Sequence, residues 1–285
     1  MNELQAYGKC ILAGEHSVVR GGEAIALPLL SRSFRLSWER RSEPKFELNE
    51  GPFSAPWRDS LSCALEKSGF TLPSPGYSLR IESDIPVQAG LGSSAALATA
   101  VVRFLEMEGA QLHDRFSLAM EIENLFHGKS SGLDVACVLE SAPIFYVKGT
   151  PASPLSLTWK PELFLFDTGK RSSTKDCVLR VEEARRPDLD RRMSQAVRQA
   201  KAALASTAPG CLAELAESLA AAGSCFAEWG LGADQKTMEL LKTKGALAVK
   251  PTGSGGGGFL LTLWKDAPPA GLGLIPVWAG SSANL

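Results

Sequence analysis

Residues 86–96 (PVQAGLGSSAA) combine small side chains with the start of a helical stretch. Small residues let a ligand approach the backbone closely, and the first turn of a helix offers unpaired N–H groups at the positive end of the helix dipole. The serine hydroxyls can add hydrogen bonds or ligate a metal. The pattern predicts a cradle for phosphate groups, with a tight turn and a serine N-cap as the structural alternative.

A second glycine-rich segment, residues 250–258 (KPTGSGGGG), lies between two apparent strands. Ordering so many glycines is entropically expensive, and a simple turn rarely needs them. We therefore expect this segment to face a ligand, with a plain flexible loop as the alternative. A dinucleotide fingerprint requires a strand–turn–helix unit near the start of a βαβ motif, and no GxxxxGK[ST] sequence occurs, so Rossmann and P-loop folds are disfavoured.

Two carboxylates stand out in the first half of the chain. Glu123 shares the apolar face of a predicted helix with Ala119 and Phe126, and a carboxylate on a buried face needs a cation or a hydrogen-bond donor. A metal site and a structural salt bridge both satisfy that need. Asp134 follows the small residues 130–132, which can open onto a site, but it also suits an N-cap for the apolar segment behind it.

The elements that must position these residues are strands and helices mixed in both halves of the chain, an α+β pattern. The segment 149–154 (GTPASP) reads as a connection, and we place a domain boundary there, giving domains 1–154 and 155–285. Strands are expected at 10–13, 24–30, 34–38, 78–81, 163–166, 246–249, 259–264 and 274–278. Helices are expected at 95–108, 114–126, 189–206 and 212–229.

Composition excludes several classes of protein. The 285 residues include 30 Lys and Arg against 31 Asp and Glu, so there is no bulk field to recruit nucleic acid or an anionic membrane. Six cysteines without a CxxC pair indicate neither a zinc site nor a disulfide framework. The apolar runs are too short to span a bilayer and no secretory signal is evident, so the expected compartment is the cytosol. A GxSxG match at 128–132 lacks a histidine after the serine, which excludes the α/β-hydrolase order.

Taken together, residues 8–19 (GKCILAGEHSVV), 86–96 and 250–258 resemble the three motifs of the GHMP small-molecule kinases, in that family's order. The resemblance extends over nearly the whole chain. It implies a two-domain α+β fold, with a ribosomal-protein-S5-domain-2-like N-terminal domain and a ferredoxin-like C-terminal domain. It also implies ATP in the cleft between them and transfer of a phosphoryl group to a small alcohol.

Within this family the chain is most similar to the mevalonate kinase branch, through residues 14–19, 127–134, 167–169 and 173–175. The sequence departs from the pattern of that branch at three places: Lys129-Ser130, Val135 and the lack of a glycine pair after Asp134. Because of these departures, phosphomevalonate or another small alcohol remains an alternative acceptor. A catalytically silent GHMP-fold sensor is the remaining alternative, and it would not need the complete set of Lys9, Glu123 and Asp134.

The resemblance also implies roles for individual residues. Mg²⁺ would be held by Ser94 and Glu123, and Lys9 and Asp134 would meet at the acceptor hydroxyl, with Asp134 taking its proton. Lys9, Arg171 and Lys175 are candidate cations for an anionic acceptor. The expected partner is a small-molecule alcohol rather than nucleic acid or a membrane, and a homodimer stays open. The ATP phosphates would contact Gly90, Leu91, Gly92, Ser93, Ser94 and Ala95. The acceptor side would include Glu15, His16, Ser173, Thr174 and Thr252.

Overall fold

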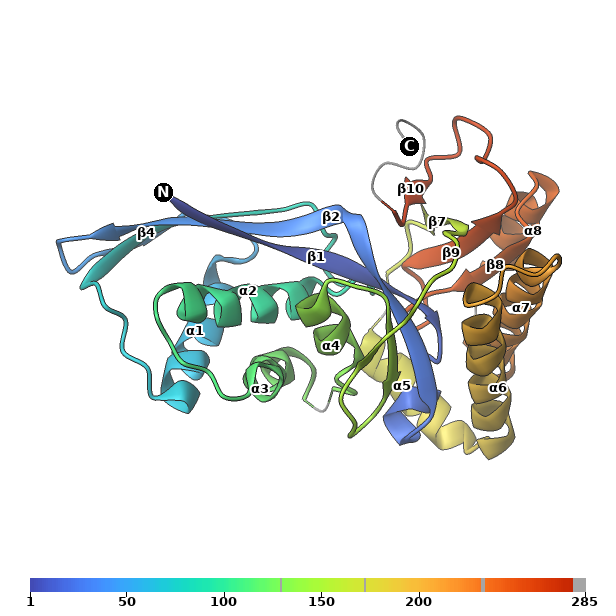
Figure 1. Cartoon of the computed structure of the whole chain (residues 1–285), viewed down its shortest axis with the longest axis horizontal. Helices are drawn as coiled ribbons and strands as arrows, with labels where there is room; N and C mark the ends of the chain where they lie inside the picture. Colours follow the sequence, from blue (N-terminus) through green and yellow to red (C-terminus); the bar gives the residue numbers. More distant parts are fainter. Residues whose placement is uncertain (129, 172, 232–233, 279–285) are drawn as a thin grey trace.

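The computed structural model describes residues 1–128, 130–171, 173–231 and 234–278. Within them two mixed α/β halves lie side by side, the first with the longer strands (Figure 1). In the described part of the chain, the first sheet contains β1 (Asn2–Ala13), β2 (Glu23–Arg41), β3 (Phe46–Leu48), β4 (Gly76–Ser83), β5 (Ile144–Val147) and β6 (Ser153–Pro154).

Strands β1 and β2 pair antiparallel along almost the whole length of β1, and β2 is the central strand of this sheet. The outer part of β2 also pairs with β4, and its inner part pairs with β5. Sequence patterns indicated separate strands at 24–30 and 34–38, but β2 runs through both. It stays continuous because its pairing with β1 resumes after a register shift between Tyr7 and Gly8.

Four helices cover one face of the first sheet (Figure 1). The predicted helices at 95–108 and 114–126 are confirmed as α2 and α3. Helix α2 lies at the centre of the layer, and its small and apolar residues 95–102 are all buried. Asp114 caps α3 by accepting a hydrogen bond from the Ser117 amide. The four helices are α1 (Ser54–Ser68), α2 (Ser93–Met107), α3 (Arg115–His127) and α4 (Leu133–Glu140).

The second sheet is antiparallel and has the strand order β10-β7-β9-β8. That is the order of a ferredoxin-like unit, in which a helical crossover joins the first two strands. Here the connection between the last two strands is the loop 265–274 and contains no helix. The strands are β7 (Glu162–Asp167), β8 (Ala248–Pro251), β9 (Phe259–Trp264) and β10 (Ile275–Pro276). Helices α5 (Thr174–Ala184), α6 (Pro187–Leu204), α7 (Cys211–Glu228) and α8 (Gln235–Thr243) precede β8.

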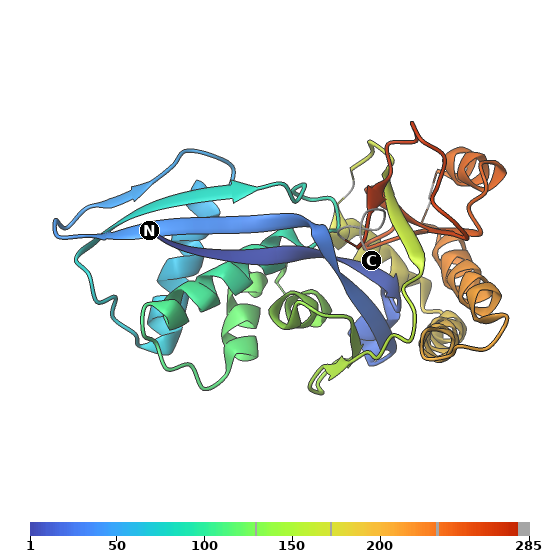
Figure 2. The same cartoon turned by 45° about the horizontal axis from the view of Figure 1, so that its top comes forward.

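Helix α6 joins the two halves. Its Asp190 forms an ion pair with Arg20, at the end of the short 3₁₀ helix η1 (Ser17–Arg20), and its Arg198 pairs with Glu23 at the start of β2. Figure 2 shows the inner ends of β1 and β2 reaching the helices of the second half. Both halves therefore meet at the end of β1 and the start of β2, beside the motif at residues 8–19.

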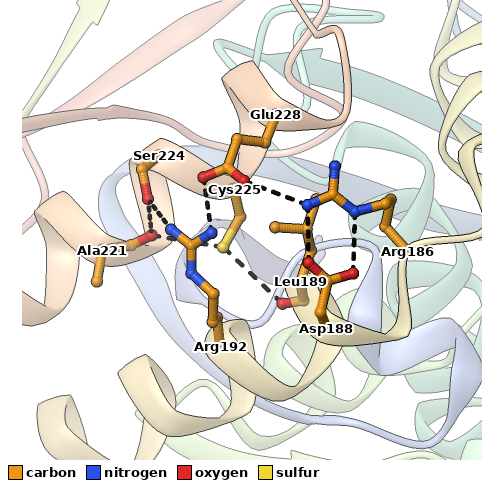
Figure 3. A network of polar contacts seen from close by, with 8 residues as sticks. All are labelled: Arg186, Asp188, Leu189, Arg192, Ala221, Ser224, Cys225 and Glu228. Atoms are coloured by element: carbon orange, nitrogen blue, oxygen red, sulfur yellow. Dashed lines mark hydrogen bonds and ion pairs between the residues drawn. The ribbon is translucent and has the colours of Figure 1, made fainter.

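A polar network fastens α6 to α7 (Figure 3). Arg192 on α6 contacts the Glu228 carboxylate at 2.7 Å and the Ser224 hydroxyl at 3.0 Å. Arg186, which precedes α6, reaches both Asp188 and Glu228. These contacts hold the α6–α7 pair as one unit behind the second sheet.

No helix in the described ranges is both long and apolar enough to cross a bilayer.

Candidate active site

The turn before α2 is shaped by its glycines. Gly90 and Gly92 have φ angles of 79° and 77°, in the left-handed region that favours glycine. Gly92 is the N-cap of α2 and supplies no side-chain cap, so the predicted serine N-cap is wrong. The amides of the first turn are therefore left for a ligand, as an anion-binding helix start requires.

Lys9 and Asp134 form an ion pair, with 2.9 Å between Nζ and Oδ2. The Lys9 side chain is 2% exposed, whereas that of Asp134 is 30% exposed and can be reached by a small molecule. Asp134 lies in the first turn of α4, where the helix dipole also favours its negative charge. The N-cap of α4 is Gly132, so the N-cap interpretation of Asp134 is wrong.

Ser94 and Glu123 meet close to this pair. The Ser94 hydroxyl donates to Glu123 Oε1 at 3.1 Å and lies 3.0 Å from His127 Nε2. Burial, together with the nearby negative charge of Asp134, raises the pKa of Glu123 to about 8, so the two carboxylates interact. Among the described residues no lysine or arginine forms an ion pair with Glu123, and the salt-bridge alternative rests on His127, whose Nε2 lies 3.6 Å from Glu123 Oε1 and which is charged only when protonated.

His127 was not predicted as a site residue. It follows Glu123 by four residues on α3, a spacing that places both side chains on the same helix face. That spacing was the available signal. Burial lowers the pKa of the His127 imidazole, which favours its neutral form.

This arrangement fits a divalent cation bound together with phosphates. Within the described part of the chain Glu123 Oε2 is buried without a hydrogen-bond partner, so the carboxylate has unused ligand capacity. No group of three or more His, Cys, Asp or Glu side chains within the described residues forms an all-protein metal cage. Mg²⁺ usually takes one or two carboxylates and completes its shell with phosphate oxygens and water, which matches a site made of Ser94, Glu123 and a helix start.

The second glycine-rich segment packs directly on the first. A Cβ on Gly253 would lie 3.3 Å from the Gly90 Cα, and one on Gly258 would lie 2.9 Å from the Ala89 carbonyl. Thr252 accepts a hydrogen bond from the Ile11 amide and donates one to the Ile11 carbonyl, both at 3.0 Å. Its hydroxyl therefore anchors the segment to β1.

Glu15 and His16 lie beside the same segment. Glu15 forms a fully buried ion pair with Lys250, with Oε1 and Nζ 2.5 Å apart. The His16 ring nitrogen lies 3.0 Å from the Ser254 carbonyl, and the ring packs edge-on against Phe226 and Trp229 of the second half. Burial lowers the pKa of His16 to about 4. Both residues therefore make contacts across the junction of the two halves.

The remaining predicted acceptor residues lie at the start of α5. Ser173 is its N-cap and accepts a hydrogen bond from the Asp176 amide, and Thr174 is its first residue. Both are exposed, and within the described residues no hydrogen bond links either one to Lys9 or Asp134. Arg171 is held by two contacts to the Asp167 carboxylate, and Lys175 is exposed. Lys129 lies outside the described residues.

Comparison with known proteins agrees with this geometry. Residues 59–141 match the model of the GHMP kinases N terminal domain. A mevalonate kinase from Aeropyrum pernix is 32% identical over 289 residues, covering 92% of this chain and 88% of the relative. The structure of L. major mevalonate kinase in complex with R-mevalonate superposes with a TM-score of 0.78 at 24% identity, covering 94% of this chain and 88% of that one.

The fold by itself does not select an acceptor. Streptococcus pneumoniae phosphomevalonate kinase superposes with a TM-score of 0.80 at 17% identity, covering 93% of this chain and 92% of that one. The expected family and the expected two-domain α+β fold are both confirmed. The chain belongs to the GHMP kinase family, and it is a kinase enzyme.

Proposed function

We propose that this enzyme transfers the γ-phosphoryl group of ATP to the hydroxyl of mevalonate, giving 5-phosphomevalonate for isoprenoid biosynthesis. The observation that carries the proposal is the juxtaposition of the Lys9–Asp134 pair with the Ser94–Glu123 contact at the starts of α4 and α2. The Aeropyrum pernix relative, named a mevalonate kinase, supports the choice of acceptor.

In this mechanism the first turn of α2 and the glycine turn before it hold the phosphates of ATP. Ser94 and Glu123 would hold Mg²⁺, which neutralises charge on the phosphate oxygens when bound. Catalysis of phosphoryl transfer is chiefly positioning and charge stabilisation, and the residues at the acceptor supply both.

Asp134 accepts the proton of the acceptor hydroxyl. At the same time the hydroxyl oxygen bonds to the γ-phosphorus of ATP, and the bond between that phosphorus and ADP breaks. Lys9, 2.9 Å away, forms an ion pair with Asp134 and stabilises the negative charge that develops on the transferring group. The acceptor side in this proposal includes Glu15, His16, Thr252, Ser173 and Thr174. Three of these residues would shape the wall of the acceptor site, because their polar groups already contact protein: Glu15, His16 and Thr252.

We assign nucleotide binding to residues 1–154 and closure of the acceptor side to residues 155–285. The first sheet ends with β6 at Pro154 and the second begins with β7 at Glu162, which supports a division there. The motifs at 8–19 and 250–258 come from different halves and pack together at the site. The acceptor would then lie where both halves contribute.

An assay of ADP release with Mg-ATP tests the proposal. The acceptors are mevalonate, phosphomevalonate, diphosphomevalonate, homoserine and galactose. We expect saturable turnover on mevalonate alone. Turnover on phosphomevalonate without turnover on mevalonate would replace the acceptor and retain the mechanism, an outcome that the likeness to the Streptococcus pneumoniae enzyme makes worth testing. ATP binding without turnover on any acceptor would contradict the proposal.

A further inference from the structure

Three ligand-type atoms from two helices converge beside the start of α2. Ser94 Oγ lies 3.1 Å from Glu123 Oε1 and 3.0 Å from His127 Nε2. The distance between Glu123 Oε1 and His127 Nε2 is 3.6 Å. The Glu123 side chain is 2% exposed, whereas that of His127 is 42% exposed. The triangle therefore has one buried vertex at Glu123, a half-buried one at Ser94 and one open to solvent at His127.

The size of this triangle matches one face of a metal coordination shell. Octahedral coordination with bonds of about 2.1 Å places neighbouring ligand atoms about 3.0 Å apart. The circle through the three protein atoms has a radius smaller than such a bond, so a single cation can contact all three. The opposite face of that cation stays free for phosphate oxygens or water.

The cluster also contains an oxygen without a hydrogen-bond partner. Ser94 donates its one hydroxyl hydrogen to Glu123, and the contact between its oxygen and His127 Nε2 is a hydrogen bond when Nε2 carries the ring hydrogen. Glu123 Oε2 is buried and has no partner among the residues that the structure describes. The nearby cation Lys9 is already bound to Asp134. A divalent cation at the centre of the triangle would satisfy all three atoms, with His127 carrying its hydrogen on Nδ1.

We propose that His127 Nε2 is a third protein ligand of the cation site, beside Ser94 Oγ and Glu123 Oε1, and that it makes this site prefer transition-metal cations such as Mn²⁺ and Co²⁺ over Mg²⁺. This rests on the proposed function only in placing the cation at Ser94 and Glu123. An imidazole nitrogen suits transition metals, whereas Mg²⁺ prefers oxygen ligands, so one nitrogen in the shell shifts the selectivity.

Pulsed EPR of Mn²⁺ on the full chain tests this assignment directly. Inorganic tripolyphosphate replaces the nucleotide, because it supplies phosphate oxygens but no nitrogen. We expect protein-bound Mn²⁺ to show coupling to a nitrogen nucleus, and ¹⁵N labelling of histidine alone to change that coupling. The coupling disappears in His127→Gln and persists in His113→Gln, a control at an exposed histidine outside the cluster.

Cation selectivity gives a second readout. The ratio of Co²⁺ to Mg²⁺ affinity, measured by calorimetry with tripolyphosphate, should fall at least about tenfold in His127→Gln, since loss of even an outer-shell partner commonly costs that much affinity. An unchanged ratio in the folded variant would contradict the selectivity part of the assignment.

Bound Mn²⁺ without histidine coupling in the unaltered protein would overturn the proposal, as would the absence of protein-bound Mn²⁺ at millimolar metal. The spectrum of the unaltered protein decides this even if His127→Gln does not fold. Histidine coupling without mevalonate turnover would retain His127 as a ligand and reject mevalonate as the acceptor. Mevalonate turnover without histidine coupling would retain the acceptor and reject His127 as a ligand.

Discussion

The stem of Lys9 lies against Gly92, so the residue that pairs with Asp134 also packs on the turn that precedes α2. A Cβ on Gly92 would be 2.8 Å from Lys9 Cγ, and the Lys9 amide donates to the Leu91 carbonyl at 2.9 Å. The acceptor side and the phosphate side of the site are therefore in direct contact. A change in the turn will move Lys9 as well.

We expect Gly92→Ala to impair both stability and turnover. The substitution puts a side chain at a left-handed φ, which costs roughly 1–2 kcal/mol, and also forces Lys9 aside. Gly69→Ala is the matched control, because Gly69 has a similar φ of 65° with nothing within 4 Å of the added carbon. Urea unfolding and kcat should separate the two variants. Equal losses of stability with full activity in both would show that the Lys9 contact does not matter.

Asp134→Asn should lower kcat by at least about a hundredfold, the lower range for loss of a general base. Binding of ATP, measured by calorimetry, should persist, because the phosphates are assigned to the first turn of α2. Asp266→Asn serves as the control, since Asp266 is exposed in the loop 265–274. Near-normal turnover in a correctly folded Asp134→Asn protein would remove the role given to this carboxylate.

Lys250→Met should destabilise the protein by about 3–5 kcal/mol, because it leaves the Glu15 charge buried and unpaired. The double variant Glu15→Gln/Lys250→Met should recover much of that loss, since neither charge remains. Urea unfolding of the two single variants and the double variant measures the coupling between the residues.

An exposed ion pair provides the comparison for that cycle. Glu82→Gln removes the partner of Arg80 at the surface, and it should change the free energy of unfolding by no more than about 1 kcal/mol. Additive effects at Glu15 and Lys250 would mean that their contact contributes nothing specific.

His16 predicts a pH dependence of stability. Its pKa is lowered by burial from 6.5 to about 4, so between these values the unfolded chain binds a proton that the folded protein does not. The contribution of His16 to the free energy of unfolding is present in full above about pH 6.5. It decreases as the pH falls towards 4, by about 3 kcal/mol at the lower end. His16→Gln should flatten this part of the profile, whereas His113→Gln should not. A profile that is the same in all three proteins would argue against a neutral, buried His16.

The sequence predicted the local features of the site well. The glycine turn, the start of α2 and the face of α3 that carries Glu123 follow from patterns within short segments, and the structure places Ser94 and Glu123 in contact. Lys9 and Asp134 were paired through the family resemblance, because 125 positions separate them and no local rule joins residues so far apart.

Other features depend on tertiary packing. The Glu15–Lys250 pair links positions 235 residues apart, and Thr252 uses its hydroxyl on β1. The helices α1, α4, α5 and α8 were not predicted. The continuous strand β2 was divided at residues 31–33, the polar run at which its pairing with β1 shifts register.

The anchoring of Thr252 to Ile11 bears on how the enzyme matures during synthesis. All of the groups assigned to proton transfer and cation binding lie between residues 9 and 134, so they are synthesised before Lys250 and Thr252. The Thr252 contacts of the Ile11 backbone and the counter-charge of the Glu15 carboxylate exist only once Thr252 and Lys250 have been made. A nascent chain that stops short of these residues carries the reactive groups but leaves a buried acid without its counter-charge, so the junction of the two halves is completed after the reactive groups have been made.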